Sequence, residues 1–184
     1  SFNKKIIIAS SQNKKNKKII KIAKKTKCNY FFGSENNVIN RFYLAAKKYK
    51  IISIMRISAD SPFIDPKIFD KAYKVFKNNK VDIVTNILNP SFPKGMSVEV
   101  FNYEILEKLN KLAKSKSDKE HVTKYIYRNR KKFKIKDFKL NKSLRKFNFS
   151  VDTLRDLKKM RILFSKMTDN KIEKKFKLEN LINL

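Results

Sequence analysis

The sequence predicts an α/β fold built on a mostly parallel sheet with helices on both faces. Short apolar runs suited to buried strands alternate with longer segments of helical periodicity over most of the chain. Such repeated strand–helix–strand units connect parallel strands through helices that cover the sheet. The chain has 184 residues, 41% of them hydrophobic, which is enough to bury a core. We therefore expect residues 1–184 to form a single domain.

The first half of the chain consists of strand–helix units in regular succession. Strands are expected at residues 6–9, 28–32, 51–57 and 81–85. Helices are expected between them, at residues 13–25, 37–48 and 66–78, because apolar residues recur there at helical spacing. The last of these helices has a clear start, since Asp65 suits the N-cap and Pro66 suits the first helical position.

The second half of the chain mixes strand and helix signals less regularly. Further strands are expected at 97–101, 133–138 and 147–151, and further helices at 103–113, 118–130, 153–166 and 172–184. Residues 97–101 alternate polar and apolar side chains, as a half-buried strand does. We expect this strand and the one at 133–138 to add antiparallel pairs to the sheet. Capping-box patterns mark two helix starts, Ser117 with Glu120 and Thr153 with Asp156.

The charge of the chain is strongly positive. Lys and Arg number 46 against 16 Asp and Glu, which gives a formal net charge of +30. Such a charge is typical of proteins that bind nucleic acid or anionic membranes. However, only 7 of the basic residues are Arg, which makes most specific phosphate and base contacts, and the lysines are spread over the whole length. We therefore favour a bias of composition, with Lys on exposed faces, over a nucleic-acid partner.

Cysteine and histidine are too few for several kinds of site. Cys28 is the only cysteine, so an intramolecular disulfide and a cysteine cluster for zinc are excluded, and a reducing, cytoplasmic setting fits. His121 is the only histidine, so a histidine-rich metal site is excluded as well. No apolar run approaches the roughly 18 residues that a membrane span needs, and we expect no membrane partner.

Two aspartates follow predicted strands. Asp60 comes after the apolar run at 51–57, and Asp152 comes after the run at 147–151. In open α/β sheets ligands bind outside the carboxyl ends of the strands, where two carboxylates can share a hard divalent cation that holds phosphates. We therefore predict that Asp60 and Asp152 are the metal-binding and catalytic residues. The alternatives are that Asp60 caps the Ser61-Pro62 turn and that Asp152 adds negative charge at a helix start.

Six blocks of the sequence match one known family in both content and order. They are Ile-Ile-Ile-Ala-Ser at 6–10, Tyr-Phe-Phe-Gly-Ser-Glu-Asn-Asn-Val-Ile-Asn-Arg at 30–41, Arg-Ile-Ser-Ala-Asp-Ser-Pro-Phe-Ile-Asp-Pro at 56–66, Phe-Pro-Lys-Gly-Met-Ser-Val-Glu-Val-Phe at 92–101, Lys-Glu-His-Val-Thr-Lys-Tyr-Ile at 119–126 and Ser-Val-Asp-Thr-Leu-Arg-Asp-Leu at 150–157. Through them the chain resembles the spore-coat polysaccharide biosynthesis protein F group of the cytidylyltransferase family. That family also contains the enzymes that make CMP-linked sugar acids.

The resemblance implies a Rossmann-like nucleotide-diphospho-sugar transferase fold and a reaction. A hydroxyl of a sugar or sugar acid attacks the α-phosphate of CTP and pyrophosphate leaves, in the synthesis of surface polysaccharide. Positioning and charge neutralisation supply most of such catalysis. Asp60 and Asp152 match the family's metal-binding aspartates, which implies Mg²⁺ as the cofactor, and two carboxylates suffice for it. Members of the wider family often pair as dimers, so a homodimer is a further expectation.

Five other residues of the matching blocks are candidate substrate contacts. They are Arg41, Lys94, Gly95, Glu99 and His121. Each has a structural alternative: a salt bridge for Arg41, one exposed lysine among many for Lys94, and an ordinary turn for Gly95. Glu99 lies on the opposite face of its strand from the neighbouring valines and could be solvated there. His121 could be structural, at the start of a helix.

Two departures from the family pattern bear on activity. Ser1 falls where the family's second strand begins, so the first strand and its phosphate-wrapping loop, of the type Ala-Arg-x-x-Ser-x-Arg-Leu-Pro-x-Lys, are expected to be missing. Ser97 stands where the family commonly has Asp. A carboxylate near the sugar site is then lost, and the identity of the sugar is not predicted. Two rival functions are a non-catalytic basic module that binds nucleic acid and an inactive partner of a related transferase. Steeply salt-dependent binding would mark the first of these.

Overall fold

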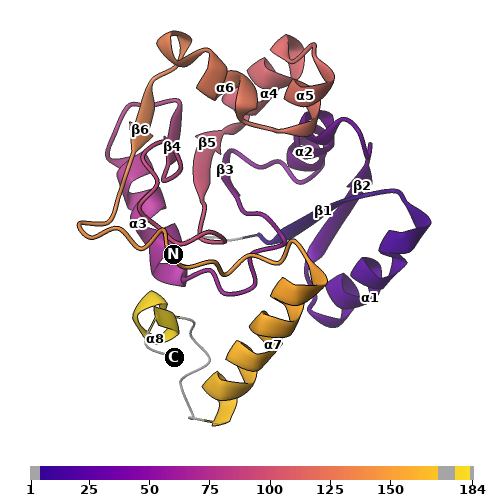
Figure 1. The fold of residues 1–184 in the computed structure, drawn as a ribbon. Coiled ribbons are helices and arrows are strands. Elements are labelled where there is room, and N and C mark those ends of the chain that lie inside the picture. Colours follow the sequence, from indigo (N-terminus) through magenta and orange to yellow (C-terminus); the bar gives the residue numbers. More distant parts are fainter. Residues whose placement is uncertain (1–4, 170–176, 183–184) are drawn as a thin grey trace. The chain divides into compact units, whose positions relative to one another are not determined.

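The structure is a computed structural model that describes residues 5–169 and 177–182 (Figure 1). The chain divides into two compact units, each made of two stretches of sequence. The first unit consists of Ser1–Ile54 with Asn102–Phe133, and the second of Met55–Phe101 with Lys134–Leu184. Each unit has its own helices and buried apolar residues. The single domain expected from the sequence stays a prediction.

The first unit begins with two parallel strands joined by a helix. β1 (Ile7–Ser11) pairs in parallel with β2 (Asn29–Gly33). A 3-10 turn at Lys14–Asn16 leads into α1 (Lys17–Lys25), which connects the two strands. α2 (Val38–Lys48) packs against both of them (Figure 1). The strand–helix–strand unit expected at the start of the chain is confirmed.

Helices α1 and α2 end on left-handed residues that are not glycine. Lys27 and Lys50, just beyond the two helices, have φ angles of 54° and 52°. At the end of α1 the N–H of Cys28 donates to the carbonyl of Ala23 at 2.9 Å, which is the Schellman arrangement, and α2 ends in the same way. A side chain in this conformation costs about 1 kcal/mol relative to glycine. With two glycines in the chain, the scarcity of glycine carries a small cost in stability.

The second stretch of the first unit is helical. α4 (Tyr103–Leu112) packs against α2, and α5 (Lys116–Glu120) and α6 (Lys124–Arg128) follow it. A 3-10 turn at Arg130–Lys132 ends the stretch. The single helix expected at residues 118–130 is therefore wrong.

The break between α5 and α6 is a buried turn. Val122 and Thr123 are both buried there, and the carbonyl of His121 accepts the N–H of Lys124 at 3.0 Å. Burial of Val122 thus outweighs the helical periodicity on either side of it. The residue that caps α5 is Ser115, two positions before the Ser expected from the capping-box pattern, so that expectation is also wrong.

The second sheet has the strand order β3-β5-β4-β6. Its strands are β3 (Ser53–Arg56), β4 (Ile83–Thr85), β5 (Glu99–Asn102) and β6 (Ile135–Asp137). β5 is antiparallel to β4, as expected for residues 97–101. β6 is parallel to β4, so the antiparallel pairing expected for 133–138 is wrong. The chain between β4 and β6 carries β5 and three α-helices, which is long enough for a parallel crossover, and the sheet is mixed.

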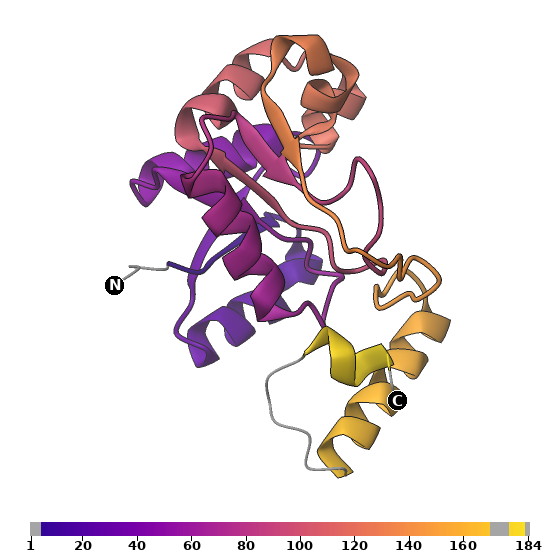
Figure 2. The same cartoon turned by 90° about the vertical axis from the view of Figure 1, so that its left-hand side faces the viewer.

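α3 (Pro66–Lys77) begins as the sequence predicts. Oδ1 of Asp65 accepts the N–H of Lys67 at 2.8 Å, and proline occupies the first turn. The other oxygen of Asp65 accepts the N–H of Leu178 at 2.8 Å, at the start of α8 (Leu178–Ile182). α3 packs against β4 (Figure 2). The buried carboxylate therefore caps one helix and fixes the start of another.

α7 (Leu154–Asp169) begins with the expected capping box. The N–H of Thr153 donates to Oδ2 of Asp156 at 3.0 Å, and the N–H of Asp156 donates to Oγ1 of Thr153 at 3.2 Å. The helix expected at 172–184 is confirmed for the residues of α8, and its other residues lie outside those described. None of the helices in the described parts of the chain is long and apolar enough to cross a membrane.

The strand expected at residues 147–151 is wrong. Asn148 forms an isolated parallel bridge with Lys94, and the residues around it are irregular. The apolar side chains of this segment serve the core instead. The main cluster of buried apolar residues in the second unit consists of Phe63, Ile68, Ala72, Phe76, Val84, Phe92, Met96, Val98, Val100, Phe138, Phe149, Met160, Met167, Leu178 and Leu181. The apolar residues of this segment thus contribute to the core without pairing within a sheet.

Candidate functional site

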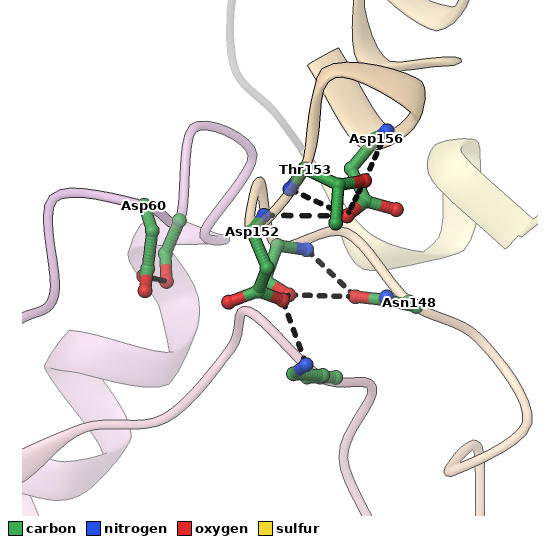
Figure 3. Close-up of polar contacts among 8 residues, drawn as sticks. Asp60, Asn148, Asp152, Thr153 and Asp156 are labelled. Carbon is green, nitrogen blue, oxygen red and sulfur yellow. Dashed lines mark hydrogen bonds and ion pairs between the residues drawn. The ribbon is translucent and has the colours of Figure 1, made fainter. Parts of the chain in front are cut away.

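The structure brings the segments that carry Asp60 and Asp152 side by side. Asp60 lies in a turn beyond Arg56, the last residue of β3, and Asp152 lies just before the start of α7. The N–H of Val151 donates to the carbonyl of Asp60 at 2.8 Å, which joins the two segments through their backbones. Figure 3 shows the two carboxyl groups extending from neighbouring segments, and both residues are exposed. Both carboxylates are therefore accessible to a ligand from solution.

Asp152 is held by a cation and a hydroxyl. Its Oδ2 lies 2.7 Å from Nζ of Lys94 and 2.9 Å from Oγ of Ser150. The hydrogen bond from Lys94, followed by that from Ser150, holds the pKa of the Asp152 carboxyl below its ordinary value, against a smaller effect of burial. Asp152 is therefore ionised at neutral pH, as a metal ligand must be.

Ser150 is buried and lies between Asp152 and Asn148, which are both labelled in Figure 3. Its Oγ lies 2.8 Å from Oδ1 of Asn148, which also accepts the N–H of Ser150 at 2.9 Å. A hydroxyl has one proton, so Ser150 donates to one of the two oxygens at a time. The buried serine thus gives Asp152 a donor whose position is fixed by the backbone.

Lys94 and Gly95 are fixed against the same segment. The N–H of Lys94 donates to the carbonyl of Phe147 at 3.1 Å, and its carbonyl accepts the N–H of Phe149 at 2.8 Å. Gly95 has a φ of +89°, and a Cβ there would lie 2.7 Å from backbone atoms of Phe149 and Ser150. Backbone conformation and close approach both require glycine, and the approaching group is the chain itself.

The other two carboxylates of this region have different partners. Oδ1 of Asp60 lies 2.9 Å from the hydroxyl of Ser61, which donates to it. Oδ2 of Asp156 accepts the N–H and the hydroxyl of Thr153 at 3.0 and 2.8 Å, and the hydroxyl bond lowers the pKa of Asp156. Asp156 is therefore engaged in starting α7, as the sequence predicts.

A shallow hollow of about 520 Å³ adjoins Asp60. Its apolar lining comes mainly from Pro62, Phe63, Met160 and Phe164. Asp60 is a charged group at this hollow, together with Arg161 of α7. The volume falls in the range of small-molecule sites, so the carboxylate has space beside it for a bound molecule.

Glu99 is buried and paired with an arginine. Its side chain is 2% exposed, and its Oε2 lies 2.6 Å from Nη1 of Arg56, whose side chain is 29% exposed. The alternative that Glu99 is solvated is therefore wrong. A buried carboxylate needs such a partner, because desolvation of an unpaired charge is costly. Nε of Arg56 is buried without a hydrogen-bond partner in the described part of the chain.

Arg41 lies in the first unit, at the junction of β2 and α2. Its Nη1 donates to the carbonyl of Ser34 at 2.8 Å. Its aliphatic part crosses Gly33, where an added Cβ would lie 3.0 Å from Cγ of Arg41. Burial lowers the pKa of Arg41, against the opposing charge of Glu35. The observed contacts are local ones, and a role in substrate binding stays a prediction.

His121 also lies in the first unit, as the C-cap of α5. Its N–H donates to the carbonyl of Ser117 at 3.1 Å, and the residue is exposed. The backbone of His121 therefore helps to form the turn between α5 and α6, while the imidazole is at the surface. Its proposed contact with substrate stays a prediction too.

Asp118 is a buried acid that the sequence reasoning missed. Its side chain is 2% exposed, and its Oδ2 lies 2.6 Å from Nη2 of Arg128 and 2.7 Å from Oγ of Ser115. The spacing of Ser115 and Asp118 is itself that of a capping box, so a signal was present. Arg56 and Ser150, which hold Glu99 and Asp152, were also missed. Arg56 is distant in the chain from its partner Glu99, and Ser150, although only two residues from Asp152, has no local pattern that marks its contact.

The acid stability of the first unit is expected to depend on Asp118. Burial raises the pKa of its carboxyl, but the hydrogen bonds from Ser115 and Arg128 and nearby positive charge outweigh burial and lower it. Because the folded pKa is below the unfolded one, Asp118 stabilises the fold above about pH 4, and this is lost as the pH falls through the folded pKa. Asp118→Asn should flatten the fall in melting temperature over that acidic range. The exposed control Glu120→Gln should keep the wild-type slope; equal slopes for all three proteins would contradict the prediction.

The donors at Asp60 and Asp152 suit a hard cation. Within residues 5–169 and 177–182, no group of three or more His, Cys, Asp and Glu side chains could hold a metal ion. A cation here would therefore rest on two carboxylates and complete its shell with water or phosphate oxygens, as the smaller divalent cations do. Both carboxylates are exposed and Asp152 is ionised, so the residues present fit such an ion.

Known proteins resemble this chain over most of its length. A family model described as cytidylyltransferase matches residues 1–183. An uncharacterized protein of Methanocaldococcus jannaschii is 36% identical over 157 residues, which cover 83% of this chain and 63% of that protein. The spore coat polysaccharide biosynthesis protein SpsF of Bacillus subtilis is 29% identical over 139 residues, which cover 74% of this chain and 57% of that protein. The chain thus spans less than two thirds of the length of these two relatives.

Solved structures share the fold. A cytidylyltransferase from Leptospira borgpetersenii serovar Hardjo-bovis matches with a TM-score of 0.90 and 30% identity, covering 96% of this chain and 74% of that one. A CMP:2-keto-3-deoxy-manno-octonic acid synthetase complexed with CTP matches with a TM-score of 0.65, covering 89% of this chain and 81% of that one. Because its sequence identity is only 11%, the second match supports similarity of fold alone. The nucleotide-diphospho-sugar transferase-like fold expected from the sequence is confirmed.

Proposed function

Because the chain belongs to the cytidylyltransferase family, we propose that it carries the core of a nucleotidyltransferase that activates a sugar or sugar acid with CTP. A hydroxyl oxygen of the sugar gives up its proton to solvent and forms the new bond to the α-phosphorus. The bond between the α-phosphorus and the bridging oxygen breaks, and pyrophosphate leaves. The Bacillus subtilis relative is named for spore coat polysaccharide biosynthesis, which favours surface polysaccharide as the destination of the product.

The observation that supports this proposal is the backbone hydrogen bond that joins the segments of Asp60 and Asp152. Transfer of a nucleotidyl group asks the protein mainly for alignment and for neutralisation of charge. Asp60 and Asp152 would hold Mg²⁺ through their carboxylate oxygens, and the ion when bound supplies positive charge to the phosphates of CTP. The backbone bond from Val151 to Asp60 would hold the main chains of the two proposed ligands next to each other.

Other residues are proposed to contact the substrates. Lys94, next to Asp152, offers an ammonium group to an anionic substrate, and Gly95 keeps its backbone there. Glu99 is proposed to accept a hydrogen bond from a sugar hydroxyl, with Arg56 holding its carboxylate in place. Arg41 and His121 are proposed as substrate contacts from the family pattern alone.

Release of pyrophosphate tests the proposal. The chain is incubated with CTP, Mg²⁺ and each member of a panel of sugars and sugar acids, and pyrophosphate is measured by a coupled assay. We expect release that depends on one of the sugars, that stops on addition of EDTA, and that ATP, GTP and UTP support poorly. Calorimetry with CTP, in the presence and absence of Mg²⁺, measures binding independently of the sugar.

Absence of sugar-dependent release, together with absence of Mg²⁺-dependent CTP binding, would overturn the proposal. A folded chain with that behaviour would fit an inactive partner of a related transferase. Binding of nucleic acid that weakens steeply with salt would instead support the basic module. The three outcomes are distinguished by the same protein preparation.

A further inference from the structure

Lys94 forms an ion pair with Asp152 in the candidate site. Its Nζ lies 2.7 Å from Oδ2 of Asp152 although 61% of the lysine side chain is exposed. The hydrogen bond and charge of Asp152 raise the pKa of Lys94, with further contributions from the charges of Asp156 and Asp60. The ammonium group therefore acts as the counterion of the site in the absence of any ligand.

The backbone of Lys94 is fixed while its ammonium group is free to move. Hydrogen bonds to Phe147 and Phe149 hold the backbone on both sides, and Gly95 lies against Phe149 and Ser150. The side chain beyond Cβ is a flexible four-carbon stem, and most of it is in solvent. Lys94 can therefore leave Asp152 by rotation about side-chain bonds, without movement of the loop.

A divalent cation bound at Asp152 has no place beside the ammonium group of Lys94. Asp60, Asp152 and Asp156 are acidic, and the basic residues near them include Lys94 and Arg161, which lines the hollow beside Asp60. A metal ion bound by Asp152 would compete with Nζ of Lys94 for the same oxygen. The two positive charges would also repel each other at this short range.

We propose that Lys94 takes the place of the metal at Asp152 while no nucleotide is bound, and that its ammonium moves to a phosphate oxygen when metal and nucleotide arrive together. This inference rests on the proposed function, since it takes the metal site of Asp60 and Asp152 as given. Lys94 is then a positioning residue that weakens the binding of free metal. A nucleotide offers the displaced ammonium a new partner, so metal and nucleotide favour each other's binding.

Binding of Mn²⁺ alone tests this role. The probe is Mn²⁺ without nucleotide, titrated into the whole chain and followed by electron paramagnetic resonance. Lys94→Met removes the competing charge and should lower the dissociation constant about two- to fivefold, the range that loss of an exposed ion pair allows. Lys94→Arg keeps a cation at the position and should bind Mn²⁺ as weakly as the wild type. Lys142→Met removes the same charge from an exposed residue elsewhere and should leave binding unchanged.

Two results would overturn the inference, and a third would overturn the proposed function with it. If Lys94→Met binds Mn²⁺ no more tightly than the wild type does, Lys94 does not compete with the metal for Asp152. An equal gain in Lys142→Met reduces the effect to net charge. Mn²⁺ binding that is insensitive to Asp152→Asn in every background means that the metal site itself is wrong. Thermal melting checks each variant, and Lys94→Gln replaces Lys94→Met if the latter does not fold.

Discussion

Replacement of Asp152 by Asn is expected to lower kcat/KM for pyrophosphate release by roughly 10²- to 10³-fold, the usual loss when one pre-organised charge is removed from such a site. The amide keeps the shape of the side chain but removes the negative charge that would hold a cation. Asp152 is 44% exposed, so the fold should tolerate the change. Steady-state kinetics with the sugar found by the panel, together with thermal melting, measure both effects.

The matched control for this prediction is the neighbouring acid, Asp156. Asp156 accepts hydrogen bonds from Thr153 at the start of α7, so Asp156→Ala should act mainly on stability. We expect a lower melting temperature for this variant and a much smaller loss of kcat/KM than for Asp152→Asn. Wild-type kinetics in Asp152→Asn, or equal losses in the two variants, would contradict the assignment of Asp152 as a metal ligand.

Replacement of Gly95 by Ala is expected to destabilise the second unit by about 3 kcal/mol, from a left-handed side chain and overpacking combined. The added Cβ would lie 2.7 Å from backbone atoms of Phe149 and Ser150, which cannot rotate away as a side chain would. Moving that backbone would also carry Asp152 away from Lys94. The variant should therefore unfold at lower denaturant concentration and lose activity. Urea unfolding followed by circular dichroism measures the change.

Gly33→Ala provides the comparison, because Gly33 is the other glycine of the chain. An added Cβ at Gly33 would lie 3.0 Å from Cγ of Arg41. The φ of Gly33 is outside the left-handed region, so an alanine there would not strain the backbone. A flexible side chain can shift to make room, so the loss of stability should be clearly smaller than for Gly95→Ala. Similar losses at the two positions would mean that the backbone contact of Gly95 is not decisive.

Signals that lie close together in the sequence predicted the structure well. The Asp65-Pro66 pair starts α3, and Thr153 with Asp156 starts α7, as expected. Both depend on hydrogen bonds within one helical turn, which composition and spacing alone determine. The shared metal site of Asp60 and Asp152 stays a prediction, although the N–H of Val151 does join their two segments through the carbonyl of Asp60.

Contacts between distant segments were harder to predict. Residues 147–151 have the alternation of a strand, yet the segment meets Lys94 through an isolated bridge. Apolar residues in an extended segment indicate burial, not whether a neighbouring strand is there to pair with it. Little in the sequence favours Lys94 over the other lysines, 39 in all, as a residue of the site. Its position beside Asp152 depends on that bridge.

Helical periodicity also failed where burial competes with it. The helix expected at 118–130 breaks around Val122, which is fully buried in a turn. A periodic pattern does not show that burial of one apolar residue in a turn can stabilise the fold more than a continuous helix would. For the same reason Asp118 was overlooked, since its partner Arg128 lies beyond the break.

The bond between the N–H of Val151 and the carbonyl of Asp60 joins main-chain atoms, so it survives exchange of either side chain. The spacing between the main chains of Asp60 and Asp152 should therefore tolerate many substitutions of the surrounding residues. An insertion or deletion of one residue in either loop is different, because it would change the position of Asp60 relative to Asp152. A gap in an alignment near residues 57–62 or 149–152 should accordingly mark lost activity better than a substitution there.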